Sequence, residues 1–266
     1  MRQLMRALRI EIRLGFVKMV RYPLQTLTSM LVLYLLFIGM FYGSKFLAGT
    51  GIGAPVDHSR NAVDAIAAYL LWFLSLFAID SMSQSISEEA QTGTLEQLYL
   101  SRWNLPLMLF MRFVATLLVS VAMLLPLLGL MTISTGVSMG LRLAESLPLI
   151  LLTSVGLCGM GYMLGAVTLI FKRIGNAMTL VQFGLLFLCL PPVEQLPRLL
   201  RYFALALPLT QGVKLLRSAM SGAGVRSVLA GVGFLAVTSL TYVIAGLAVF
   251  HWSEDTARAR GLLGHY

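Results

Sequence analysis

Long apolar stretches alternate with short polar ones along almost the whole chain. A helix that crosses a membrane needs about 20 mostly apolar residues, because each residue advances it by about 1.5 Å. Segments that approach this length are residues 24–46, 63–84, 107–134, 147–171, 175–193 and 227–251. The pattern therefore predicts an all-α membrane protein whose six transmembrane helices lie within residues 23–252, followed by a short tail at 253–266.

The first 22 residues predict a helix of a different kind. Apolar side chains recur there at helical spacing, and a separate basic row is formed by Arg2, Arg6, Arg9 and Arg13. An amphipathic helix with a basic face rests at the interface between headgroups and acyl chains instead of crossing the bilayer. The alternative is a soluble helix packed on a partner, which is disfavoured because Pro23 and a long apolar segment follow at once.

Short helices are expected in the stretch before the last apolar segment, residues 194–225. Its central part, 199–209, is too short and too often interrupted by polar residues to cross a membrane. We expect a pair of re-entrant or interfacial helices there, hinged near Pro208 and lying on the external side.

A dense polar stretch, residues 86–104, separates the second apolar segment from the third. Glu88 and Glu89 end the preceding helix and Gly93 breaks it. Thr94 and Gln97 then form a capping-box pattern, in which two side chains satisfy the free amide groups at the start of a helix. The sequence therefore predicts a short helix outside the bilayer.

Three apolar side chains share one face of this short helix. Leu95, Leu98 and Tyr99 follow the spacing i, i+3, i+4, whereas Glu96 lies on another face. Such a face fits either a groove on another protein or the membrane domain of the chain itself. The sequence pattern leaves both interpretations open.

Composition and charge place this pattern in a membrane. Of the 266 residues, 58% are hydrophobic and only 12% are charged, which excludes an ordinary soluble domain. The 20 basic residues outnumber the 11 acidic ones, and most of the excess lies at the ends of apolar segments. Basic residues there orient a chain in the membrane and attract anionic lipids, so we expect no nucleic-acid partner. They predict an integral membrane protein with both termini in the cytoplasm and an external 48–62 loop.

One ionisable residue inside an apolar segment is a candidate for function. Asp80 lies in the 63–84 segment, where a carboxylate is costly and tends to face a cavity or a partner. It could contribute to a transport pathway or to coupling. It also lies near the cytoplasmic end of its segment, where water or the polar stretch could satisfy it without any role in transport.

Residues for nucleotide or metal chemistry do not come together in the sequence. None of the four lysines follows a glycine and precedes serine or threonine, as the phosphate-binding loop of an ATPase requires. The three histidines are scattered, and Cys158 and Cys189 each lie alone in an apolar segment. We expect no catalytic residue, cofactor site or metal site in this chain.

Two stretches resemble the ABC-2 type transporter permeases, the membrane subunits of ABC exporters. Gly93, Thr94, Leu95 and Glu96 are similar to the text of that family's first cytoplasmic loop, directly after the second span. The second stretch is the run Leu207, Pro208, Leu209 and Thr210 followed by Lys214 and Arg217, which looks like the region before the family's last span. The order and spacing of the apolar segments agree with this resemblance over essentially the whole chain.

The resemblance implies a permease without its own ATPase. In that family the first loop is a coupling helix that docks on a cytoplasmic ABC ATPase, which holds the ATP and magnesium. The docking residues would be Glu88, Glu89, Gly93, Thr94, Leu95, Glu96, Leu98 and Tyr99. The resemblance further implies a homodimer or a pair with a related permease, in a bacterial inner membrane, that exports a drug, a lipid or a glycoconjugate. A non-transporting scaffold or receptor that recruits a cytoplasmic partner through residues 93–102 is the alternative function.

Overall fold

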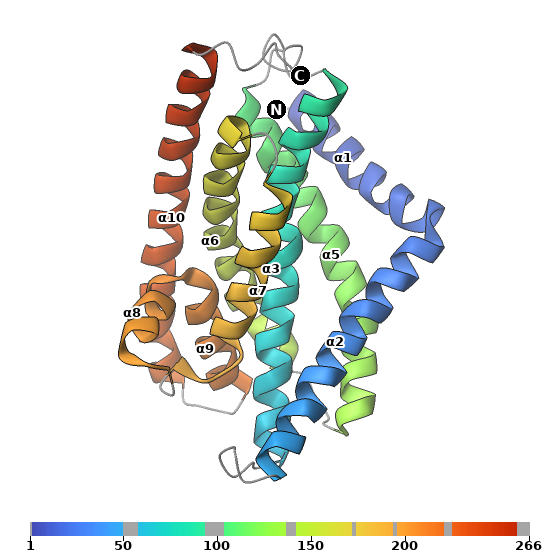
Figure 1. The fold of residues 1–266 in the computed structure, drawn as a ribbon, viewed down its shortest axis with the longest axis vertical. Coiled ribbons are helices and arrows are strands. Elements are labelled where there is room, and N and C mark those ends of the chain that lie inside the picture. The colour runs from blue at the N-terminus through green and yellow to red at the C-terminus, as the bar shows by residue number, and fades with distance from the viewer. Residues whose placement is uncertain are drawn as a thin grey trace.

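The computed structural model describes residues 2–49, 58–93, 104–136, 142–171, 174–193, 196–220 and 225–259. These residues form α-helices joined by short connections, with no strand among them, which confirms the all-α class. The helices are α1 (Arg2–Arg21), α2 (Pro23–Gly49), α3 (His58–Thr92), α5 (Leu105–Thr135), α6 (Arg142–Phe171), α7 (Gly175–Cys189), α8 (Arg198–Ala206), α9 (Pro208–Met220) and α10 (Val225–Ala259). The start of α1 and the end of α10 lie at the same end of the bundle (Figure 1).

Five of the described helices are long and apolar enough to cross a membrane: α2, α3, α5, α6 and α10. The remaining expected span, 175–193, is represented by α7, which has only 15 residues. At 1.5 Å per residue it extends about 22 Å, less than the roughly 30 Å of a hydrocarbon core. The six-span count therefore stays a prediction, whereas the five longer helices bear out the corresponding segments.

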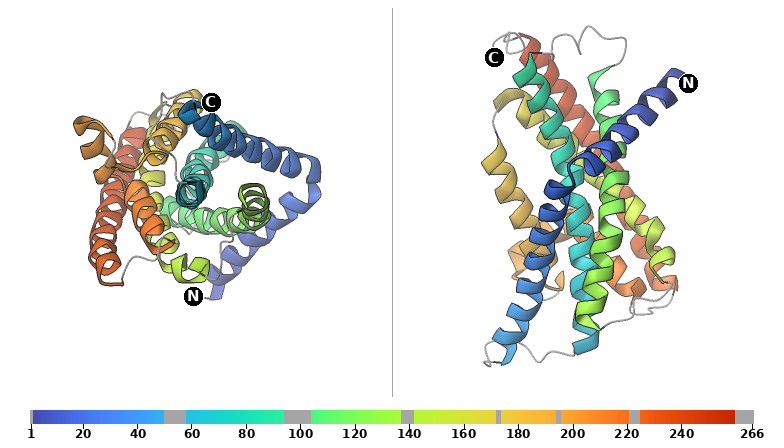
Figure 2. Two further views of the ribbon diagram at one scale, coloured as in Figure 1. Left: turned by 90° about the horizontal axis from the view of Figure 1, so that it is seen from below. Right: turned by 90° about the vertical axis from the view of Figure 1, so that its right-hand side faces the viewer.

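Helix α3 is the central element of the bundle. It packs against α5, α6, α7 and α9 (Figure 2), and it contains most of the largest fully buried side chains, among them Trp72, Tyr69 and Phe73. The polar ends of two of these rings bond to neighbouring helices. Tyr69 donates its hydroxyl to the Leu33 carbonyl of α2 at 2.5 Å, and Trp72 donates its indole N–H to the Gln182 carbonyl of α7 at 2.8 Å. A displacement of α3 would therefore be transmitted to several of its neighbours.

Small residues bring α6 against α10 and α3. A side chain at Gly159 would collide with the backbone at Tyr242 of α10, and one at Gly246 would collide with the Gly159 carbonyl. Gly161 and Gly165 lie against Met82 and Ile86 of α3. At Gly159 and Gly246 the two backbones are in direct contact, whereas at Gly161 and Gly165 the glycines make room for side chains of α3.

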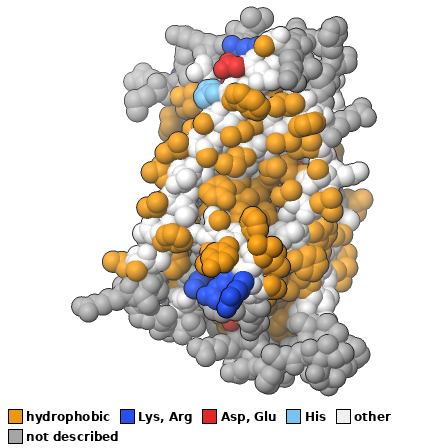
Figure 3. Space-filling model, turned by 60° about the vertical axis from the view of Figure 1, so that its left-hand side comes forward, with side chains coloured by type: hydrophobic (Ala, Val, Ile, Leu, Met, Phe, Trp, Pro, Cys, Tyr) orange, Lys and Arg blue, Asp and Glu red, His pale blue; other side chains and the backbone are white. Residues whose placement is uncertain are grey.

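The outer surface of the bundle is largely apolar. Hydrophobic side chains cover the middle of one face, and charged ones gather toward its two ends (Figure 3). Helix α10 alone exposes Leu229, Phe234, Val237, Leu240 and Ile244, each at more than half of its full area. Such a surface fits the acyl chains of a bilayer.

Candidate functional site

The polar stretch after the second span begins where α3 ends. Helix α3 stops at Thr92, and Gly93 adopts the left-handed conformation, with φ of 70°, while its amide donates to the Ala90 carbonyl at 3.2 Å. This is a typical glycine helix ending, and it bears out the break expected at Gly93. The expected docking residues Thr94, Leu95, Glu96, Leu98 and Tyr99 lie outside the described residues.

An ionic cluster holds the end of α3 to two other helices. The guanidinium of Arg112 on α5 contacts the Glu89 carboxylate of α3, with 2.5 Å from Nη2 to Oε1. The same guanidinium approaches the Glu11 carboxylate of α1, with 3.5 Å from Nε to Oε1. We call these three residues the Arg112 cluster. It connects the N-terminal helix, the second span and the third span at the base of the predicted coupling loop.

The Arg112 cluster neutralises a positive charge within the third span. Arg112 lies seven residues after the start of α5, and its side chain is only 23% exposed. An arginine inside a membrane helix is costly unless carboxylates or water satisfy it. Glu89, 16% exposed, and Glu11, 30% exposed, provide that charge. Because Arg112 and Glu89 are largely shielded from water, breaking their contact should cost more than breaking an ordinary surface ion pair.

The cluster was not identified from the sequence, although a signal was present. An arginine within an apolar segment requires an acidic partner, and Glu11 is the one acidic residue in the amphipathic N-terminal helix. At 100° per residue, Glu11 lies roughly opposite the basic row on that helix. The basic row is the face expected at the membrane interface, and the opposite face carries the contact with the bundle.

Helix α1 is present as expected, and its basic row faces outward. Arg6, Arg9 and Arg13 are exposed, and the side chain of Arg2 lies outside the described part of the chain. The helix packs against the start of α5 and contacts α2 at its own end. It runs obliquely to the long spans (Figure 1), as an interfacial helix would.

Asp80 faces a polar cavity between α3, α6 and α7. The cavity has a volume of about 950 Å³ and is lined by polar side chains, including Ser83, Gln84, Thr168 and Gln182. Asp80 is half-buried, and the Gln84 amide lies 3.4 Å from its Oδ2. The structure thus brings Asp80 to a cavity but not to the Arg112 cluster, which lies on other faces of α3 and α5.

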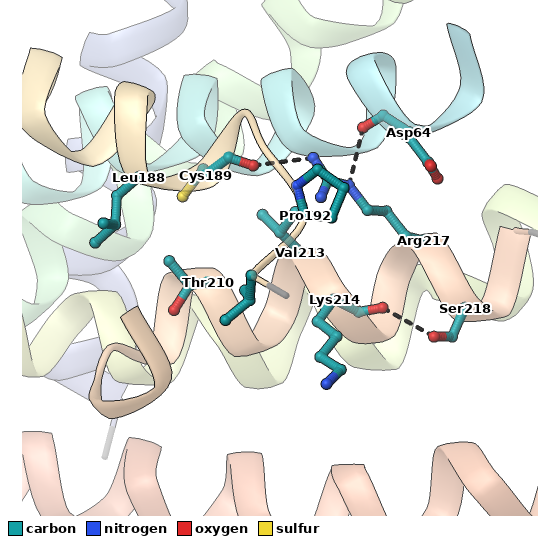
Figure 4. A pocket seen from close by; sticks show the side chains of 10 residues that line it. Asp64, Leu188, Cys189, Pro192, Thr210, Val213, Lys214, Arg217 and Ser218 are labelled. Carbon is teal, nitrogen blue, oxygen red and sulfur yellow. Dashed lines mark hydrogen bonds between the residues drawn. The ribbon is translucent and has the colours of Figure 1, made fainter. Parts of the chain in front are cut away.

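The helix pair before the last span has its own basic anchor. Helices α8 and α9 meet at Leu207–Pro208, where the hinge was expected. Arg217 of α9 donates to the backbone carbonyls of Asp64 on α3 at 3.2 Å and of Cys189 at 2.9 Å (Figure 4). It also donates to the Leu190 carbonyl at 2.8 Å. The last two carbonyls end α7, where a helix leaves carbonyls without internal partners and carries partial negative charge. Arg217 therefore joins the end of α7 to the pair and to α3.

Comparison with known proteins identifies one family. A family model described as ABC-2 family transporter protein matches residues 56–248. The matched segment contains Glu89, Arg112, Asp80 and Arg217, whereas α1 and α2 precede it. No curated protein matches the chain significantly.

Proposed function

Because the chain belongs to the ABC-2 transporter family, we propose that it is the membrane subunit of an ATP-driven exporter whose ATPase is a separate chain. It would move a lipophilic small molecule, a lipid or a glycoconjugate out of the cytoplasm or the inner leaflet. ATP and magnesium would bind to the partner ATPase. Two such permeases, identical or related, would form the complete membrane domain.

The observation that supports this proposal most is the position of α3. The helix lies at the centre of the bundle, and its last turn leads directly into the polar stretch at 93–102. A force applied to that stretch would act first on the central helix. An exporter needs such a connection, because ATP closes the ATPase subunits outside the membrane while substrate moves inside it.

The Arg112 cluster extends the same connection to two more helices. Glu89 lies four residues before Gly93, so a displacement of the loop moves this carboxylate against the guanidinium on α5. Glu11 carries the contact on to α1. We infer that the cluster keeps the interfacial helix, the second span and the third span together while the loop is moved.

The docking surface would be the short helix at 93–102. Leu95, Leu98 and Tyr99 would insert into a groove of the ATPase, with Glu96 at the polar rim of the interface. Removing buried apolar anchors commonly costs more than about 1 kcal/mol each. Docking on a cytoplasmic ATPase requires that the loop and both termini be cytoplasmic, which needs six spans, with α7 as the fifth. The membrane would be a bacterial inner membrane.

Affinity purification tests this docking directly. The chain is purified with mild detergent from its own cells, and co-purifying proteins that carry an ATPase phosphate-binding loop are identified by mass spectrometry. Leu95→Ala/Leu98→Ala should lose that protein. Leu199→Ala/Tyr202→Ala is the matched control, because it removes two exposed apolar side chains from α8, at the other end of the bundle. Retention of the ATPase by a monodisperse 95/98 variant would remove the docking proposal.

A receptor or scaffold that recruits a partner through residues 93–102 would give the same purification result. ATP turnover separates the two functions. In an exporter, reconstitution of the permease in lipid nanodiscs should change the turnover of the bound ATPase, and Glu96→Lys should reduce that change. A partner without ATPase activity would favour the scaffold.

A further inference from the structure

A charged cavity lies beneath the interfacial helix, beside the Arg112 cluster. It has a volume of about 420 Å³ and is enclosed by α1, α3 and α5. Each helix contributes four residues at the spacing i, i+3, i+4, i+7, beginning at Glu11, Ser81 and Arg112. A stripe with that spacing is one face of a helix, so three faces converge on one space.

Two of its charged side chains are not used by the cluster. Arg112 and Glu11 contact each other, but the cavity is also lined by Lys18 of α1 and Glu88 of α3. Among the described residues, neither Lys18 nor Glu88 forms an ion pair. The cavity therefore presents one ammonium group and one carboxylate that remain available to a ligand.

Uncharged groups complete the lining. Gln84 and Thr116 add an amide and a hydroxyl, whereas Leu14, Ala115 and Val119 add apolar walls. A ligand with two opposite charges, polar ester groups and the beginning of an apolar chain matches this combination. A purely anionic ligand matches it less well, because Glu88 and Glu11 would repel it.

Glu88, the outermost α3 residue of the cavity, lies at the depth of lipid headgroups when the end of α3 is taken as the membrane surface. Glu88 lies four residues before the end of α3, or about 6 Å at 1.5 Å per residue. The headgroup layer on each side of a bilayer is about 5–7.5 Å thick, half of the difference between roughly 40–45 Å overall and a 30 Å core. An amphipathic helix such as α1 lies at this same level.

We propose that this cavity binds the headgroup of a zwitterionic phospholipid with a primary amine. The phosphate contacts the Lys18 ammonium group and the Arg112 guanidinium, and the ammonium group of the lipid donates hydrogen bonds to the Glu88 carboxylate. Phosphatidylethanolamine has this chemistry. Phosphatidylcholine carries the same charges but has no N–H to donate, and phosphatidylglycerol has no cation. The lipid would lie between α1 and the spans that it contacts, and its binding does not depend on an ATPase partner.

Lipid titration of the delipidated, detergent-purified chain tests the proposal. Phosphatidylethanolamine, phosphatidylcholine and phosphatidylglycerol with identical acyl chains are added separately, and bound lipid is counted by native mass spectrometry. Phosphatidylethanolamine should bind at least about tenfold more tightly than phosphatidylglycerol, since a charge-assisted hydrogen bond contributes enough free energy for such a ratio. Glu88→Gln should lose that preference, because Glu88 accepts from the ammonium group. Lys18→Gln should weaken the binding of all three lipids, because they share the phosphate, and Lys18→Arg should keep that binding.

Matched controls remove other charges from the same side of the molecule. Arg9→Gln removes an exposed cation of the basic row, and Asp255→Asn removes an exposed acid of α10; neither residue lines the cavity. Both should retain the preference for phosphatidylethanolamine. Equal or tighter binding of phosphatidylglycerol would overturn the proposal, because general attraction to basic residues would then explain the lipid. An unchanged preference in well-folded Glu88→Gln, or unchanged lipid binding in well-folded Lys18→Gln, would also overturn it.

A soluble ligand with the same headgroup is the remaining source of this chemistry. Glycerophosphoethanolamine, which has no acyl chains, is therefore added as a competitor. It should displace the lipid only at concentrations far above that of the lipid itself. Displacement at equal concentration would assign the cavity to a soluble zwitterion and overturn the assignment to a membrane lipid.

Discussion

Replacing Arg112 by methionine tests the role of the ionic cluster. Methionine is an apolar side chain of similar length, so the change removes the charge and leaves the Glu89 carboxylate without its partner at 2.5 Å. Breaking a buried pair costs about 3–5 kcal/mol, whereas an exposed pair contributes at most about 1 kcal/mol. Since the side chains of Arg112 and Glu89 are 23% and 16% exposed, we expect a loss of about 2 kcal/mol in the free energy of unfolding.

The contact with Glu11 should contribute much less. Its distance is 3.5 Å and its carboxylate side chain is 30% exposed, so Glu11→Gln should cost roughly 0.5 kcal/mol. The exchange Arg112→Glu/Glu89→Arg restores opposite charges across α3 and α5. It should recover part of the loss, because residues in direct contact do not contribute independently.

Thermal unfolding measures these differences with groups already in the chain. Cys158 and Cys189 are free and buried, so a thiol-reactive dye reports their exposure on unfolding. A loss of 2 kcal/mol corresponds to a decrease of about 4–8 °C in Tm for a domain of this size. If Arg112→Met has the same Tm as the wild type, the cluster does not hold α3 and α5 together.

Two other contacts and the charge of the N-terminal segment each give a further prediction. Arg217→Met should lower the free energy of unfolding by about 2–3 kcal/mol, because three backbone carbonyls lose a charged donor. The same dye measures the change in Tm, and Arg201→Met, which removes an exposed arginine, is the control. An unchanged Tm in Arg217→Met would contradict this role. Gly159→Leu should prevent monodisperse purification, since its side chain would enter the backbone of α10, whereas Gly184→Leu, which has open space, should be tolerated; equal behaviour in size-exclusion chromatography would argue against glycine-mediated packing. A cysteine at Gly53 should react with an impermeant maleimide from outside intact cells, because the N-terminal arginines hold the chain start in the cytoplasm, and labelling from the cytoplasmic side alone would reverse the topology.

Local patterns predicted the helices well because each of their signals lies within one segment. The hinge at Pro208, the helix ending at Gly93 and the amphipathic α1 follow from proline geometry, glycine conformation and helical spacing. The end of α7 also has a local signal, Pro191 and Pro192, which the apolar run conceals because hydropathy counts proline with the other residues of the segment. Residues 190–193 continue the apolar run of 175–193, but the backbone leaves the helix after Cys189, and Arg217 binds the carbonyls there.

Contacts between distant segments could not be predicted in the same way. Glu11 and Arg112 are separated by about 100 residues, and hydropathy gives no register between one span and another. The central position of α3 was equally hidden, since α3, α5 and α10 are all long and apolar. Only the packing shows that α3 is surrounded while α10 exposes much of its surface.

Photo-crosslinking from position 98 tests the central proposal most directly. A photoreactive amino acid replaces Leu98 in the full chain, and another replaces Leu199 on exposed α8 as the control for non-specific capture. After irradiation of intact cells, the account predicts a covalent adduct between position 98 and an ABC ATPase, identified by mass spectrometry, and no such adduct from position 199. An ATPase adduct from position 199 with none from position 98, in a folded and membrane-inserted chain, would contradict the docking of this loop on an ATPase.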